Sequence, residues 1–94
     1  MQLPVIHMNG TNVRELLEQT TESMYTIRRA MATLRQNSPN GRDYYPAGPQ
    51  AFTAAVDENE ARIAKLRDVL TELEEMAEYL STKEAEEADR KARR

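Results

Sequence analysis

Mostly apolar side chains recur along the chain at alternating steps of four and three residues, in two long stretches. The first stretch carries one row of this kind: Val13, Leu17, Thr20, Met24, Ile27, Met31 and Leu34. The second carries a longer row: Phe52, Val56, Asn59, Ile63, Leu66, Leu70, Leu73, Ala77 and Leu80. Steps of four and three residues bring side chains to one face of an α-helix. The pattern therefore predicts two amphipathic helices, over about residues 12–37 and 49–80.

Capping and breaking residues agree with these two helices. Asn12 followed by Glu15 three positions later is typical of a helix N-terminus, and Pro39 cannot continue the first helix. Pro49, directly after Gly48, suits the first turn of the second helix. The connection over residues 38–48 is short enough to reverse the chain. We expect an all-α fold, an antiparallel two-helix hairpin packed like a coiled coil.

A chain reversal about Asp43 brings apolar positions of the two rows opposite one another. In this alignment Ile27 faces Asn59, and Leu34 faces Phe52. A polar amide in such a row fixes the register or the oligomeric state more often than it serves chemistry. We therefore interpret Asn59 as a register residue.

The apolar stripe of the second helix is wider than two helices alone would cover. Val69 and Met76 lie beside its row and broaden the stripe. With 94 residues, one Phe and no Trp, the chain cannot build a thick core of its own. We expect the hairpin to complete a bundle, either as a homo-oligomer or by docking onto a larger protein assembly, with Val69 and Met76 as partner-binding residues.

The first eleven residues are too apolar for a tail that contacts only solvent. Leu3, Val5, Ile6 and Met8 precede the turn signal Asn9-Gly10-Thr11, and Pro4 favours extended backbone before it. We expect an extended N-terminal arm over residues 1–11. The arm lies either on its own hairpin or on a neighbouring subunit, with Val5 and Ile6 as contact residues.

The predicted connection contains Arg42, Tyr44 and Tyr45, residue types that dominate protein–protein hot spots. One interpretation is that the two rings cap the end of the bundle. The other is that the loop presents Arg42 and a tyrosine to a partner. Pro46 favours extended backbone at Tyr45, so consecutive rings should point to opposite sides, one inward and one outward.

Charge is divided along the hairpin although the whole chain carries only −3. Residues near the predicted tip sum to +2, those at the open end to −6. The charged tail over residues 81–94 should continue the second helix and fray. Two alternative functions follow: a nucleic-acid-associated accessory factor that uses basic residues near the tip and the C-terminal Arg90, Lys91, Arg93 and Arg94, or an acidic inhibitor that mimics nucleic acid. Net acidity disfavours the first, because binding depends on neutralising phosphates.

Enzyme chemistry has little support in this composition. The chain has no Cys and one His, so thiolate catalysis and His-based metal sites are disfavoured, and its clustered carboxylates fall on a solvated helix face. We expect no catalytic residues, no metal, no cofactor and no small-molecule substrate. The N-terminal residues resemble neither a secretory leader nor a membrane span, so we expect a cytoplasmic protein without membrane contact.

Two segments carry a family resemblance: Ile6-His7-Met8-Asn9-Gly10-Thr11 before a helix containing Leu16-Leu17, and Asn40-Gly41-Arg42-Asp43-Tyr44-Tyr45-Pro46 before a second helix rich in Ala, Arg and Leu. In these the chain resembles small uncharacterised helical-hairpin proteins of bacteriophages and prophages. The resemblance implies a phage accessory or structural role, in the host cytoplasm or the virion. Together with the open stripe, it favours a non-enzymatic protein–protein interaction or assembly module.

Overall fold

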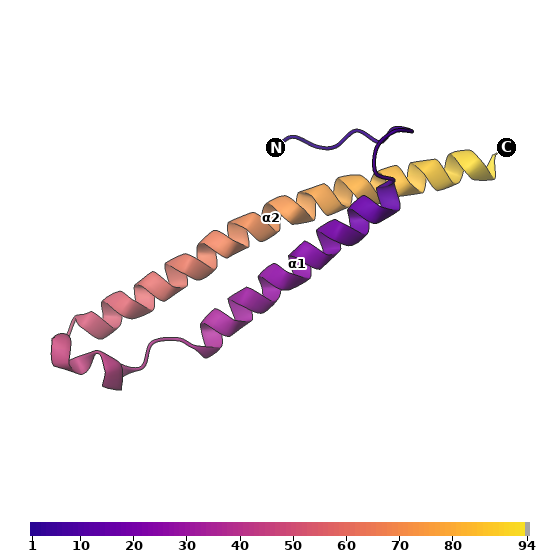
Figure 1. Ribbon diagram of the computed structural model, residues 1–94. Coiled ribbons are helices and arrows are strands. Elements are labelled where there is room, and N and C mark those ends of the chain that lie inside the picture. The colour runs from indigo at the N-terminus through magenta and orange to yellow at the C-terminus, as the bar shows by residue number, and fades with distance from the viewer. Residues whose placement is uncertain (94) are drawn as a thin grey trace.

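The computed structural model describes residues 1–93, and over these residues the regular structure is helical without strands. Two long helices, α1 (Val13–Gln36) and α2 (Ala51–Ala92), pack antiparallel along each other (Figure 1). The rod measures 71 × 21 × 20 Å. The predicted all-α hairpin is confirmed. Arg94, the last residue of the predicted tail and basic cluster, lies outside the described residues.

Helix α1 begins and ends at polar residues that satisfy its backbone. The side-chain oxygen of Asn12 accepts a hydrogen bond of 2.9 Å from the backbone N–H of Glu15, as the capping pattern predicted. At the other end, the backbone N–H of Asn37 donates to the carbonyl of Thr33 at 3.0 Å. Pro39 follows two residues later and keeps the helix from continuing.

The connection between the helices contains two short 3₁₀ turns, η1 (Gly41–Asp43) and η2 (Tyr45–Ala47). Gly48, with a φ of 108°, then redirects the chain into α2. This helix starts at Ala51, two residues after the predicted position at Pro49. It continues through the charged segment 81–92, whose Ala, Glu, Lys and Arg residues favour helix.

The core is a single layer of side chains between the two helices. At its centre Met31, Ile63 and Leu70 are buried, and four half-buried apolar residues pack against them: Met24, Ile27, Leu34 and Leu66. Near the start of α1, Val13 is buried, and on α2 Leu80 is fully buried. The apolar rows predicted from the spacing thus supply the contact between the helices.

The alignment of the helices differs from the predicted one by seven residues, which is one heptad. The Nδ2 of Asn59 donates a hydrogen bond of 3.1 Å to the carbonyl of Leu34, seven residues beyond the expected Ile27. Leu34 belongs to the last turn of α1, where carbonyls lack partners within the helix, and Ser38 donates to Arg35 instead. Asn59 therefore caps the end of α1 from the facing helix and sets the register.

This shift explains why the predicted contact of Leu34 with Phe52 is wrong. Counting from the Asn59–Leu34 bond, the end of α1 at Gln36 is level with Asp57. The first residues of α2 therefore extend past α1, and Phe52 among them is 39% exposed. A shift by one heptad keeps the same helix faces together, so the spacing of apolar residues could not detect it.

Candidate interaction site

Helix α2 carries a second row of residues beside the buried one, at the edge of the core. Its members are spaced by seven and hence lie along one side of the helix: Arg62, Val69, Met76, Lys83 and Arg90. We call this set the open row. Val69 is 41% exposed and Met76 is half-buried, whereas Leu70, one residue after Val69, is only 6% exposed. The two apolar residues predicted as contacts therefore lie at the edge of the core with one side in water.

The N-terminal arm covers the C-terminal part of the open row. It folds back over α2 from the start of α1 (Figure 1), after a turn in which the N–H of Gly10 donates to the carbonyl of His7 at 3.2 Å. Ile6 and His7 line a pocket of about 500 Å³ together with Lys83 and Arg90. In the structure of the single chain the arm lies on its own hairpin.

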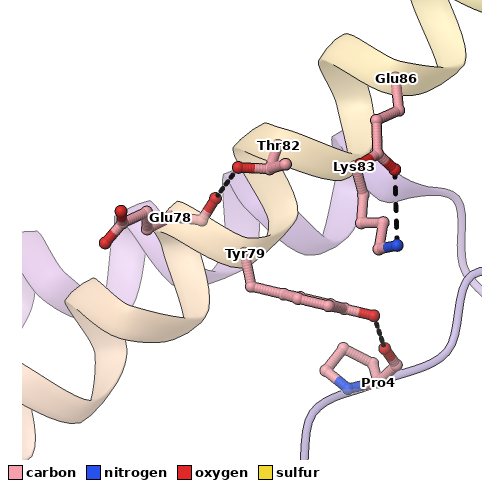
Figure 2. A network of polar contacts seen from close by, with 6 residues as sticks. All are labelled: Pro4, Glu78, Tyr79, Thr82, Lys83 and Glu86. Carbon is pink, nitrogen blue, oxygen red and sulfur yellow. Dashed lines mark hydrogen bonds and ion pairs between the residues drawn. The ribbon is translucent and has the colours of Figure 1, made fainter.

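Tyr79 anchors the arm to α2. Its hydroxyl donates a hydrogen bond of 2.8 Å to the backbone carbonyl of Pro4, across 75 residues of sequence (Figure 2). The ammonium of Lys83 lies 5.6 Å from the centre of the Tyr79 ring and 3.4 Å from a carboxylate oxygen of Glu86. These contacts hold the ring and its hydroxyl toward the arm.

The two arm residues predicted as contacts have different surroundings. Ile6 is half-buried against the hairpin, as are Leu3 and Pro4, whereas Val5 is 74% exposed. Met8, at the turn, is also almost fully exposed. The arm therefore uses one side to hold to α2 and presents apolar side chains on the other.

The three predicted contact residues of the connecting loop also differ from one another. Arg42 is exposed, Tyr44 is half-buried and Tyr45 is 75% exposed. The rings thus differ in burial as expected, but not through the expected backbone, because Tyr45 begins the 3₁₀ turn η2 instead of being extended before Pro46. The loop lies at the opposite end of the rod from the arm, so the predicted residues form three separate regions (Figure 1).

A metal site and a membrane-spanning helix each have requirements that can be compared with the described residues. Among residues 1–93, no three His, Asp or Glu side chains lie close enough together to hold a metal ion. Within the same residues, neither helix contains an apolar stretch that could span a membrane.

The sequence interpretation missed the residues that connect the arm to α2. Tyr79 was not singled out, because it lies outside the apolar row and its partner is a backbone carbonyl far away in the chain. A usable signal was present in Lys83 and Arg90, which continue the spacing of Val69 and Met76 by seven. An apolar arm and a tyrosine beside that row could have indicated the contact.

Comparisons of this chain with models of protein families, with curated proteins and with solved structures found no match.

Proposed function

We propose that the protein is a non-enzymatic protein–protein interaction or assembly module that binds through the apolar part of the open row. The observation that carries this proposal is the contrast between Val69, 41% exposed, and the adjacent Leu70, 6% exposed. An exposed valine followed on the same side by a half-buried methionine leaves an apolar strip along a rod whose other outer positions are rich in charge. Such strips are typical of surfaces that another protein covers.

The thinness of the core supports the same conclusion. Ile27, Leu34, Leu66 and Leu73 belong to the inner rows, yet they remain half-buried because only one helix faces each of them. Burying apolar area stabilises a fold by about 25 cal/mol per Å². A partner that packs against this face would bury these side chains further and complete a bundle.

The two ends of the rod provide secondary contacts in this proposal. Tyr45 and Arg42 at the loop, and Val5 on the arm, are exposed residues of kinds that protein interfaces use. Two cations of the C-terminal segment lie beside carboxylates: Lys91 is 3.9 Å from Glu87, and Arg93 is 3.3 Å from Asp89. Carboxylates beside these cations weaken the case for phosphate binding and favour a protein partner.

A phage accessory or structural role, implied by the resemblance of the chain to phage helical hairpins, belongs to the same proposal. An assembly module of a phage should be encoded beside structural or packaging genes. Examination of the neighbouring genes is the direct check, and a location among unrelated metabolic genes would remove this part of the proposal.

A matched pair of charge insertions tests the proposed contact. Val69→Glu places a carboxylate in the open row, while Ala64→Glu makes the same change at an exposed position five residues earlier, about 140° around the helix. Tagged wild-type chain and both variants are used to capture untagged chain and other proteins of the source cell. We expect Ala64→Glu to retain the captured proteins and Val69→Glu to lose them. Equal capture by both variants would contradict the proposal.

A further inference from the structure

The two halves of the rod differ in charge. In α1, Arg14 is followed by the acidic Glu15, Glu18 and Glu22, and the later charged residues are basic: Arg28, Arg29 and Arg35. In α2, Asp57, Glu58 and Glu60 come first, Arg62, Lys65 and Arg67 follow, and then come Asp68, Glu72, Glu74, Glu75 and Glu78. Because the helices are antiparallel, residues 25–36 and 51–67 share the half of the rod near the loop and sum to +3, whereas residues 13–24 and 68–78 share the other half and sum to −7.

The change of sign occurs at one level of the rod. The Asn59–Leu34 hydrogen bond fixes the alignment, and nine residues further along this pair become Asp68 and Tyr25. Tyr25 lies between Glu22 and Arg28, where the charge of α1 changes from acidic to basic, and Asp68 is the first of the carboxylates that follow Arg67 in α2. Val69, the most exposed apolar residue of the open row, lies at the same level.

From this arrangement we infer that the open row binds a second copy of the chain, antiparallel to the first, with the two-fold axis close to Val69. The inference rests on the proposed function and names its partner. A parallel pair would place basic half on basic half and acidic half on acidic half. An antiparallel pair places each basic half on the acidic half of its partner, which favours one orientation and disfavours the other.

Specific residues come together in this pairing. Arg62 and Met76 are each seven residues from Val69, so Arg62 of one copy meets the level of Met76 in the other. Lys65, four residues before Val69, comes level with residue 73 and beside Glu72. The apolar contact at Val69 is therefore flanked on both sides by a Lys65–Glu72 pair of opposite charge.

The same symmetry places the arm of one copy at the level of the connecting loop of the other. Glu86, in the segment beneath the arm, lies seventeen residues after Val69, and Phe52, at the start of α2, lies seventeen before it. At 1.5 Å per residue both are about 25 Å from the axis. The arm of one copy, with exposed Val5, therefore reaches the level of the exposed loop of the other, with Tyr45.

Single cysteines can determine the orientation, because the chain contains no cysteine of its own. Arg62→Cys and Met76→Cys chains carrying different tags are mixed and oxidised under mild conditions. The antiparallel pair predicts the mixed disulfide between positions 62 and 76, together with rapid self-linkage of Val69→Cys. Predominant 62–62 and 76–76 disulfides would overturn the antiparallel pairing.

A charge swap tests the electrostatic argument independently of any cross-link. Lys65→Glu should weaken dimerisation on the order of tenfold, because two symmetric attractions become repulsions. Adding Glu72→Lys to the same chain should restore most of the affinity, since each altered residue then meets its altered counterpart in the other copy. Failure of the double variant to recover would contradict the pairing, because positions 65 and 72 are too far apart to contact within one chain.

The outcomes separate this inference from the proposed function. A chain that stays monomeric at all concentrations, or a dimer linked in the parallel orientation, overturns the antiparallel second copy. The proposed function then still stands if Val69→Glu loses captured proteins and Ala64→Glu retains them. It fails with the inference if the two charge insertions behave alike.

Discussion

Two neighbouring rows of α2 share a helix and a spacing but differ in their surroundings. The inner row, represented by Ile63 and Leu70, faces α1 and is buried. The open row, one residue away, keeps Val69 and Met76 at the edge of the core and is charged at Arg62 and Lys83. The proposed function assigns the apolar residues in the central part of the open row to contact with a partner, since Val69 contributes little to the buried core. The inner row should govern stability of the hairpin and the open row its association.

The difference between the two rows is tested most sharply by shortening one side chain in each of them. Leu70→Ala should lower the free energy of unfolding by about 2–5 kcal/mol, because it removes buried methyl groups and leaves a cavity. Denaturant unfolding at a protein concentration low enough to avoid association measures the loss.

Val69→Ala is the matched control for Leu70→Ala. It should cost well under 1 kcal/mol in the same experiment, since much of the valine side chain already contacts water. Equal losses for both variants would mean that the two rows play the same part.

The second prediction concerns the polar member of the inner row. Asn59→Ala should cost about 1–3 kcal/mol, because it leaves the partly buried carbonyl of Leu34 without its donor. The register should also become less well defined, since an apolar row accepts shifts by one heptad. Denaturant unfolding gives the first effect, and distances between spin labels on the two helices give the second. Unchanged stability together with one sharp distance would show that Asn59 does not set the alignment.

The connecting loop allows the same comparison between a half-buried and an exposed side chain, Tyr44 and Tyr45. Tyr44→Ala should lower stability by about 1–2 kcal/mol, because the half-buried side chain removes apolar area from water when the chain folds. Tyr45→Ala, at a ring that is 75% exposed, should change stability by less than about 0.5 kcal/mol. Thermal melting of both variants compares the two effects. The reverse order of losses would show that the outward ring, and not Tyr44, caps the bundle.

The smallest effect is expected at the arm. Tyr79→Phe removes the hydroxyl that binds the carbonyl of Pro4 and should weaken arm docking by about 0.5–1.5 kcal/mol. Nuclear Overhauser contacts between the residue 79 ring and Pro4 should weaken while the hydrogen exchange of α1 and α2 stays the same. Contacts that keep their intensity would mean that packing of Leu3 and Ile6, without the hydroxyl, is sufficient to hold the arm.

Much of the fold could be predicted from the sequence, because its signals are local or periodic. The apolar rows, the Asn12 cap and the break at Pro39 each depend on residues within a few positions of one another. The register was predicted wrongly because a shift by one heptad keeps the same faces in contact. What decides it is a bond between the Asn59 amide and one unpaired carbonyl, which depends on where α1 ends.

The candidate site was less accessible to sequence reasoning for a similar reason. Val69 and Met76 could be identified from their place beside the inner row. The anchoring of the arm by Tyr79 could not be identified. Every residue has a backbone carbonyl, so the type of residue at position 4 does not show that its carbonyl accepts a hydrogen bond. The backbone of Tyr45 was also mispredicted, since the bias imposed by Pro46 was overridden by the 3₁₀ turn of the loop.

The binding of a second copy of the chain to the open row is tested most directly by measuring how the melting temperature depends on protein concentration. If association stabilises the folded chain, the midpoint should rise as the concentration is raised from about 1 to 100 μM, because mass action favours the bound form. The same series for Val69→Glu should show a flat midpoint, and Ala64→Glu should follow the wild type. A cooperative wild-type melt whose midpoint is independent of concentration would contradict the account.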